Sequence, residues 1–126
     1  MALALAGAVA CGDSSTGLVN VEGTYTLRSI NGVTLPYVVL QTGTDKVEVV
    51  DDVISLATNG TYTEVGHTRS TSNGQVSTDT GTDNGTYTTT GTSITLRSSD
   101  GTSTVGTVNS GTLTLVDQGL SAVFTR

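Results

Sequence analysis

The sequence offers few side chains that could act as a nucleophile or as a general base. The chain contains one cysteine, Cys11, and one histidine, His67. Nucleophilic catalysis needs a base beside the nucleophile, and these two positions support no Ser-His-Asp or Cys-His arrangement. A metal site built on His67 would lack a second histidine, so we interpret His67 as a surface residue. The sequence therefore predicts a protein that is not an enzyme and that uses neither a metal ion nor a cofactor.

The carboxylates do not suggest acid–base or calcium chemistry either. Asp51 and Asp52 are adjacent, so on a strand they point to opposite faces and cannot act as a pair. Residues 79–85 read Asp-Thr-Gly-Thr-Asp-Asn-Gly and offer hard oxygen ligands for calcium. They lack the spacing and the closing glutamate of an EF-hand loop. We therefore interpret residues 79–85 as a plain hairpin loop.

Glu64 is the one carboxylate for which the alternation of residues along a strand suggests a position inside the core. It shares strand parity with Tyr62, so if Tyr62 points into a core then Glu64 does too. A carboxylate inside a core must lie near an opening, be paired or be used. A bulge after Asn59-Gly60 would instead turn Glu64 outward, because a slip of one residue exchanges the two faces. Both alternatives remain open at this stage.

Composition indicates one all-β domain and excludes a nucleic-acid-binding protein. The 126 residues carry 5 Lys and Arg against 11 Asp and Glu, which gives a formal net charge of −6. Without a basic stripe the chain cannot neutralise phosphates. Threonine is abundant, and there are 16 Gly and a single Pro. β-branched residues suit strands and glycine suits tight turns, so a helical bundle is excluded.

Turn dipeptides and alternating hydrophobicity predict an antiparallel meander. Asn-Gly, Asp-Gly and similar pairs recur from residue 31 to residue 119, and such pairs favour hairpin turns. Between them apolar and polar residues alternate, as in Ile94 and Leu96 against Thr95 and Arg97. Closing the sheet buries one face and removes the exposed edges, so we expect a barrel of about eight strands. The expected strands are 22–30, 37–41, 46–57, 60–69, 75–80, 85–90, 92–98, 102–108, 111–117 and 120–126. The polar segments 41–45 and 66–82 are expected to be mobile loops at the barrel rim.

The first ten residues have the features of a secretion signal. They read Met-Ala-Leu-Ala-Leu-Ala-Gly-Ala-Val-Ala, a run too short to span a bilayer, and they end in small residues before Cys11. The run carries no Lys or Arg, so we expect the precursor to begin upstream. With a single cysteine no internal disulfide can form. The alternative, a small buried cysteine, is disfavoured because Cys11 lies between an alanine-rich run and a polar stretch.

The sequence Ala-Val-Ala-Cys at 8–11 resembles the lipobox of bacterial lipoproteins. The resemblance implies that the mature chain begins at Cys11 with several acyl chains attached, which together hold a protein on a membrane. Residues 11–20 would then form a flexible tether. In such lipoproteins a residue other than Asp after the cysteine goes with outer-membrane sorting, and here that residue is Gly12. We therefore expect a lipid-anchored protein of the bacterial cell envelope, at the outer membrane.

Residues 21–126 resemble small bacterial lipocalin-like lipoproteins. The run Gly-Thr-Tyr-Thr-Leu at 23–27 is similar to their opening strand, and Ala-Val-Phe-Thr-Arg at 122–126 is similar to their last strand. Gly-Thr-Tyr at 85–87 and Ile-Thr-Leu at 94–96 fall where such domains repeat related strands. The resemblance implies a lipocalin-like barrel. Lipocalins carry a Trp on the first strand and an Arg near the end of the last strand. Here Tyr25 stands in the Trp position, and Arg126 is the candidate for the Arg. We expect the first and last strands to pair, with the Arg126 guanidinium across the Tyr25 ring.

Two functions fit this sequence. In the first, which the resemblance implies, the barrel binds a small apolar or amphipathic ligand whose polar or cationic end reaches one polar handle. The expected inward residues are Leu27, Leu56, Tyr62, Glu64, Tyr87, Leu96 and Leu113. In the second, the barrel is packed solid and the surface of the protein contacts a partner, as in an envelope inhibitor or an assembly subunit. The sequence does not identify that protein partner.

Overall fold

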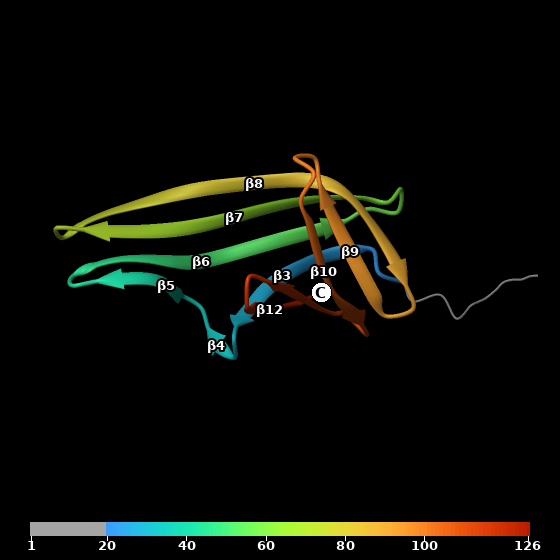
Figure 1. The fold of residues 1–126 in the computed structure, drawn as a ribbon, viewed down its shortest axis with the longest axis horizontal. Helices are drawn as coiled ribbons and strands as arrows, with labels where there is room; N and C mark the ends of the chain where they lie inside the picture. Colours follow the sequence, from blue (N-terminus) through green and yellow to red (C-terminus); the bar gives the residue numbers. More distant parts are fainter. Residues whose placement is uncertain (1–19) are drawn as a thin grey trace, which may run out of the picture.

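A computed structural model describes residues 20–126 of the protein as an all-β fold (Figure 1). The predicted signal segment and Cys11 lie outside the described residues. No helix of the described range is long and apolar enough to cross a membrane. The strands are β3 (Gly23–Ile30), β4 (Val33–Thr34), β5 (Tyr37–Thr42), β6 (Asp45–Leu56), β7 (Thr61–Ser72), β8 (Gln75–Thr90), β9 (Ser93–Ser98), β10 (Ser103–Asn109), β11 (Thr112–Asp117) and β12 (Leu120–Thr125).

Eight of the strands close into an antiparallel barrel, consistent with the lipocalin-like fold expected from the sequence. From β6 to β12 each strand pairs with the next along the chain. β3 then pairs with β12 on one side, with Leu27 opposite Phe124, and with β6 on the other, with Tyr25 opposite Ile54. The predicted pairing of the first and last strands is confirmed. β4 and β5 are additional strands outside the closed ring, paired with β3 and β6 respectively.

The barrel interior is filled by the apolar side chains that alternate along its strands. Tyr25, Ile54, Ile94 and Leu113 have no exposed surface, and Phe124 is 2% exposed. Alternation places these residues on one face of the sheet, and closure brings that face together from all eight strands. The complete core consists of Tyr25, Leu27, Ile30, Ile54, Leu56, Tyr62, Ile94, Leu96, Val108, Leu113, Leu115 and Phe124.

Three strands are too long for the barrel and continue out of it as an open extension of the same sheet. β3 pairs only with residues 53–56 of β6, and β9 pairs only with residues 85–90 of β8. Beyond these points residues 45–52 of β6, 66–72 of β7 and 75–84 of β8, together with β5, form a four-stranded extension, here called the arm. In Figure 1 the arm projects to the left of the barrel, with β8 along one edge and β5 along the other.

The arm corrects the prediction of mobile rim loops. Residues 66–82 are not a loop: they belong to β7 and β8, joined by a turn in which Asn73 and Gly74 have φ of 52° and 76°. In segment 41–45 only residues 43 and 44 form a turn, at the arm tip, while Thr42 ends β5 and Asp45 begins β6, so the segment is not part of the barrel rim. The expectation failed because threonine and serine occupy both faces of these strands, so the polar segment has no apolar alternation although its β-branched residues favour strands.

The predicted hairpin at Asn84-Gly85 is also wrong, since both residues lie inside β8. A Cβ atom at Gly85 would lie 1.9 Å from the backbone oxygen of Arg97 on β9. Gly85 is therefore required not for a turn but for the close approach of two strands, at the point where β8 passes from the arm into the barrel. Elsewhere the same type of pair does form a turn: Asn31 and Gly32 have φ of 51° and 79°.

We predict that Gly85→Ala destabilises the barrel by about 1–3 kcal/mol or more, because the added methyl group overlaps the backbone of β9 and β8 must move. The matched control is Gly81→Ala in the same strand, where a Cβ would meet nothing within 4 Å. Urea unfolding of the two variants measures the difference. Equal stabilities would contradict this role of Gly85.

Candidate functional site

Where the arm leaves the barrel, the barrel end stays open and carboxylates surround the opening. This cavity, here called the mouth, has a volume of about 350 Å³. Its apolar floor includes Phe124, Leu115 and Ile30. The carboxylates on its wall are Asp52, Glu64, Asp83 and Asp117, and the other lining residues are Thr102, Thr104, Gln118, Leu120 and Ala122.

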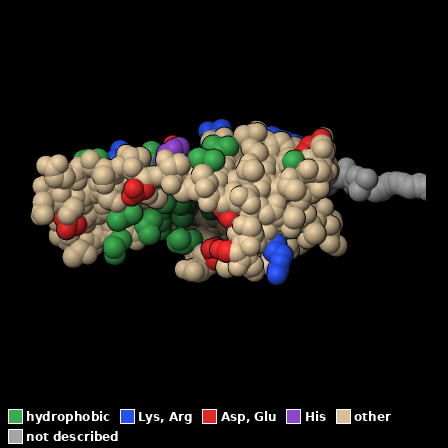
Figure 2. All heavy atoms as spheres, turned by 90° about the horizontal axis from the view of Figure 1, so that it is seen from above, with side chains coloured by type: hydrophobic (Ala, Val, Ile, Leu, Met, Phe, Trp, Pro, Cys, Tyr) green, Lys and Arg blue, Asp and Glu red, His purple; other side chains and the backbone are tan. Residues whose placement is uncertain are grey.

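A second hollow, of about 380 Å³, continues from the mouth onto the arm and shares Asp52, Glu64 and Asp83 with it. Its floor lacks side chains where Gly66 of β7 lies opposite Gly81 of β8. Figure 2 shows acidic side chains gathered at the hollow between arm and barrel, with hydrophobic side chains beside it on the arm. Among the described residues that line either cavity there is no Lys or Arg.

Asp83 is held in place by two neutral hydroxyl groups. The Tyr62 hydroxyl donates to Asp83 Oδ2 at 2.8 Å, and the Ser98 hydroxyl donates to Asp83 Oδ1 at 2.5 Å. Both donors come from buried positions of the barrel wall, since Tyr62 is 3% and Ser98 is 9% exposed. Burial, and next the hydrogen bond to Asp83, raises the pKa of Tyr62, so its hydroxyl stays protonated as a donor.

Asp52 is the carboxylate of the mouth whose burial is least offset by hydrogen bonds. Its Oδ1 atom is buried and has no hydrogen-bond partner within the described residues. The group is packed against the backbone of Gly66: a Cβ there would lie 3.2 Å from Asp52 Oδ1. Burial, and next the neighbouring Glu64 carboxyl, raises the pKa of Asp52 to about 9. At neutral pH Asp52 therefore carries a proton in the free protein, and a bound cation would favour its ionised form.

The structure separates the predicted ligand-binding residues into two groups. Glu64 lies at the mouth, and the register between β6 and β7 is unbroken from residue 62 to residue 66, so the alternative with a bulge is not the one adopted. The others belong to the packed wall of the barrel. Leu27, Leu56, Tyr62, Leu96 and Leu113 are core residues, and Tyr87 packs against them while its hydroxyl donates to Ala57 O at 2.6 Å. Leu56 and Tyr62 also line a small third cavity, of about 260 Å³.

The opposite end of the barrel is closed by Tyr25 and Arg126. The guanidinium carbon of Arg126 lies 5.6 Å from the centre of the Tyr25 ring. Arg126 also donates from Nη1 to the carbonyl oxygens of Asn20 and Glu22, at 2.9 and 2.8 Å. A Cβ at Gly23 would lie 2.6 Å from Arg126 Cδ, so glycine makes room for the arginine stem. Within residues 20–126, the mouth is therefore the one barrel end where acidic side chains line an open cavity.

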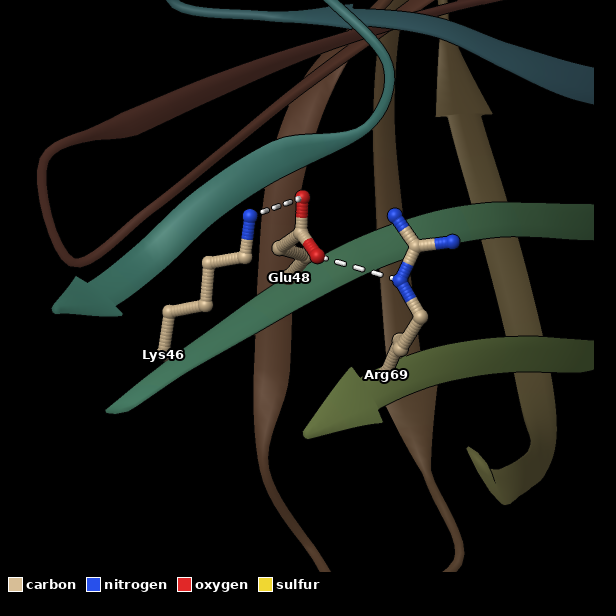
Figure 3. A network of polar contacts seen from close by, with 3 residues as sticks. All are labelled: Lys46, Glu48 and Arg69. Carbon is tan, nitrogen blue, oxygen red and sulfur yellow. Dashed lines mark hydrogen bonds and ion pairs between the residues drawn. The ribbon is translucent and has the colours of Figure 1, made fainter. Parts of the chain in front are cut away.

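The outer face of the arm carries the paired charges. Glu48 accepts from Arg69 Nε at 3.0 Å, and Lys46 Nζ lies 3.7 Å from its other oxygen (Figure 3). The hydrogen bond from Arg69 is the main cause of the lowered pKa of Glu48. On the same face His67 Nδ1 and Asp51 Oδ1 are 2.5 Å apart, with the side chain of His67 37% exposed. Among the described residues of the arm, both Lys46 and Arg69 are therefore paired with Glu48 on this face.

Sequence reasoning found Glu64 but missed its neighbours in the mouth. Asp83 was assigned to a loop, although it shares parity with Gly85 and Tyr87 along what is one strand, β8. Asp52 was correctly expected on the opposite face from Asp51, yet nothing local indicates that it is buried. Asp117 lies at the end of β11, and only closure of the barrel brings it to the same opening.

Within residues 20–126 no group of three or more His, Cys, Asp or Glu side chains is arranged to hold a metal ion. No protein-family model matches the chain, and no curated protein of similar sequence is found.

We predict that Asp52→Asn raises the free energy of unfolding at pH 8 by at least about 1.4 kcal/mol, the equivalent of one pKa unit, because the neutral amide has no proton to release when the chain unfolds. Because the folded state raises the pKa of Asp52, it holds a proton that the unfolded chain releases, so native stability falls as the pH rises from about 4 towards about 9. Urea unfolding across this range should show a shallower decline in the variant. The control is Asp79→Asn, at an exposed carboxylate of β8. An equal pH dependence in wild type and Asp52→Asn would contradict the assignment.

Proposed function

We propose that this protein is a non-enzymatic binding protein of the bacterial envelope whose barrel mouth holds a small amphipathic molecule with a cationic group. The observation that carries the proposal is a cavity lined by four acidic residues and by apolar side chains, with no basic residue among the lining residues. An apolar segment would be favoured by burial on Phe124 and Leu115, and the cation by the carboxylates around it. This refines the sequence-based expectation of an apolar ligand with one polar or cationic end.

The chemistry of the mouth supports a cation rather than an anion. A cation beside Asp52 would replace the proton that this carboxyl holds in the free protein and would supply the missing partner of Oδ1. An anion would face acidic side chains with no Lys or Arg among the residues that line the mouth. The hydroxyl groups of Tyr62 and Ser98 keep Asp83 in a fixed orientation, so the ligand meets a preorganised carboxylate.

A second candidate function, a surface interaction protein with a packed barrel, is favoured by a different observation. The side chains expected to line an internal ligand cavity are buried against one another, with Leu113 fully buried and Leu27 and Leu96 each 4% exposed. In this reading the barrel is a scaffold and the arm makes the contact with a partner. The two candidates differ in whether the mouth binds a small molecule.

We predict that decyltrimethylammonium binds the protein at least about tenfold more tightly than decanoate, which has a similar apolar chain and the opposite charge. Isothermal titration calorimetry below the micelle concentration measures both. Glu64→Gln and Asp83→Asn should each weaken binding of the cation several-fold, whereas Asp45→Asn at the arm tip should not. Equal binding of both probes, or binding of neither, would leave the surface interaction protein as the better candidate.

We also propose that the protein is anchored by lipid at Cys11, which rests on the lipobox resemblance alone. We predict that the intact mass of the protein extracted from bacterial membranes corresponds to a chain that begins at Cys11 and carries acyl groups. Cys11→Ser should release the protein from the membrane fraction. A mature chain with unmodified Cys11, or one that retains Met1, would contradict lipidation.

A further inference from the structure

The arm has one long edge that no strand of the described chain covers. β8 pairs with β7 over its whole arm portion, but its other neighbour, β9, begins to pair only at Gly85. Residues 75–83 therefore form a free strand edge, and all but Asp83 are exposed. In Figure 1 this edge runs along the upper side of the arm, away from β4 and β5.

Two backbone hydrogen bonds show which residues point their backbone groups to this edge. Tyr87 N donates to Gly60 O at 2.9 Å, toward β7, and Ser99 N donates to Asn84 O at 2.9 Å, toward β9. In an antiparallel ladder successive residues direct their N–H and C=O groups to alternate sides. The register of β7 with β8 is unbroken, so the even-numbered residues Val76, Thr78, Thr80 and Thr82 present theirs to the free edge.

The edge carries two charged side chains, Asp79 and Asp83, but lacks the other features that prevent a strand from pairing with another chain. Natural edge strands are blocked by charged side chains, especially lysine, or by proline, bulges or a covering segment. Residues 75–83 contain no Lys, Arg or Pro, and their register with β7 has no bulge. The other edge of the arm, β5, is interrupted by a register shift at residue 39. Of the two edges, β8 is the longer and the more regular.

We propose that a second copy of this chain pairs with the β8 edge, forming a two-fold symmetric antiparallel dimer centred on Thr80. An antiparallel strand pair related by a two-fold axis uses the same edge in both copies, so the partner needs no further surface. The two arms would form one continuous sheet, and the barrels would lie at its opposite ends, where they cannot collide.

The carboxylates of β8 disfavour the two registers next to this one. With Thr80 on the axis, Asp79 lies opposite Gly81 of the second copy and Asp83 lies opposite its Ser77. Thr78 lies opposite Thr82 of the second copy on the other face, and such threonine pairs stabilise sheets. Moving the axis to Asp79 places two carboxylates opposite each other, and moving it to Gly81 places Asp79 opposite Asp83. Like charges directly opposite destabilise a sheet, so both shifts are disfavoured.

The test is Thr80→Pro in the full chain, with Cys11→Ser as background so that neither lipid nor a disulfide joins the copies. Proline removes an N–H that faces the free edge and leaves the bonds from β8 to β7 intact. Sedimentation equilibrium should show a concentration-dependent dimer for the background chain. Thr80→Pro should raise its dissociation constant about tenfold or more, because both copies lose a hydrogen bond. The matched control, Thr80→Val, keeps the N–H and should change the constant by less than about threefold.

A second measurement does not depend on how well the proline variant folds. Thr80→Cys in the same background should form a disulfide-linked dimer on mild oxidation, because opposite Cα atoms in such a pair are about 5.5 Å apart. Thr42→Cys on β5 should not. A monomer at all concentrations, dimerisation unchanged by Thr80→Pro in a folded protein, or cross-linking through Thr42 instead of Thr80 would each overturn the proposal.

Discussion

The pairing of β3 with β6 controls the rest of the architecture. It joins residues 23–26 to residues 53–56 and thereby closes the ring of eight strands. Because β6, β7 and β8 are longer than this contact, the parts that β3 and β9 do not cover must continue as an open sheet. The mouth, the arm and the free edge of β8 all follow from the difference in length between the closing strand and the strands that it closes.

The two ends of the barrel have opposite electrostatic character. At the closed end the Arg126 guanidinium lies over the Tyr25 ring and donates hydrogen bonds to backbone carbonyl oxygens, so its positive charge is engaged within the protein. At the mouth the side chains are acidic, and among those of the described residues only Asp83 accepts from hydroxyl groups on both oxygens. The basic residues of the arm are engaged by Glu48 on the outer face. This separation makes the mouth attractive to a cation without a change of fold.

Much of the barrel could be predicted because short stretches of the sequence determine its strands and turns. Alternation at 93–98 and at 112–117 identifies inward side chains such as Ile94 and Leu113, and positive-φ pairs such as Asn31-Gly32 mark turns. Closure also follows, since two apolar terminal strands need partners. The arm could not be predicted in this way, because a strand with polar residues on both faces has no periodic signal. For the same reason Gly85 was interpreted as a turn residue, although its function is to let β9 approach.

The mouth depends on contacts that are distant in the sequence. Asp52, Asp83 and Asp117 come from three strands, and only the closed register brings their side chains to one opening. Their chemistry also depends on burial rather than on residue type: Asp51 and Asp52 are neighbours, yet one is paired with His67 on the outer face and the other is buried without a partner for Oδ1. The alternation in a single sequence shows which face of a strand a residue occupies, but it does not show how deeply that residue is buried.

The bonds from Arg126 to Asn20 and Glu22 have a mechanical consequence. A force applied to the chain at Asn20 acts along β3, which is hydrogen-bonded to β6 on one side and to β12 on the other. Such a load shears two ladders at once instead of opening one bond after another. The arginine contacts lie ahead of both ladders and would take up the load first. The closed end of the barrel is therefore the mechanically strong end.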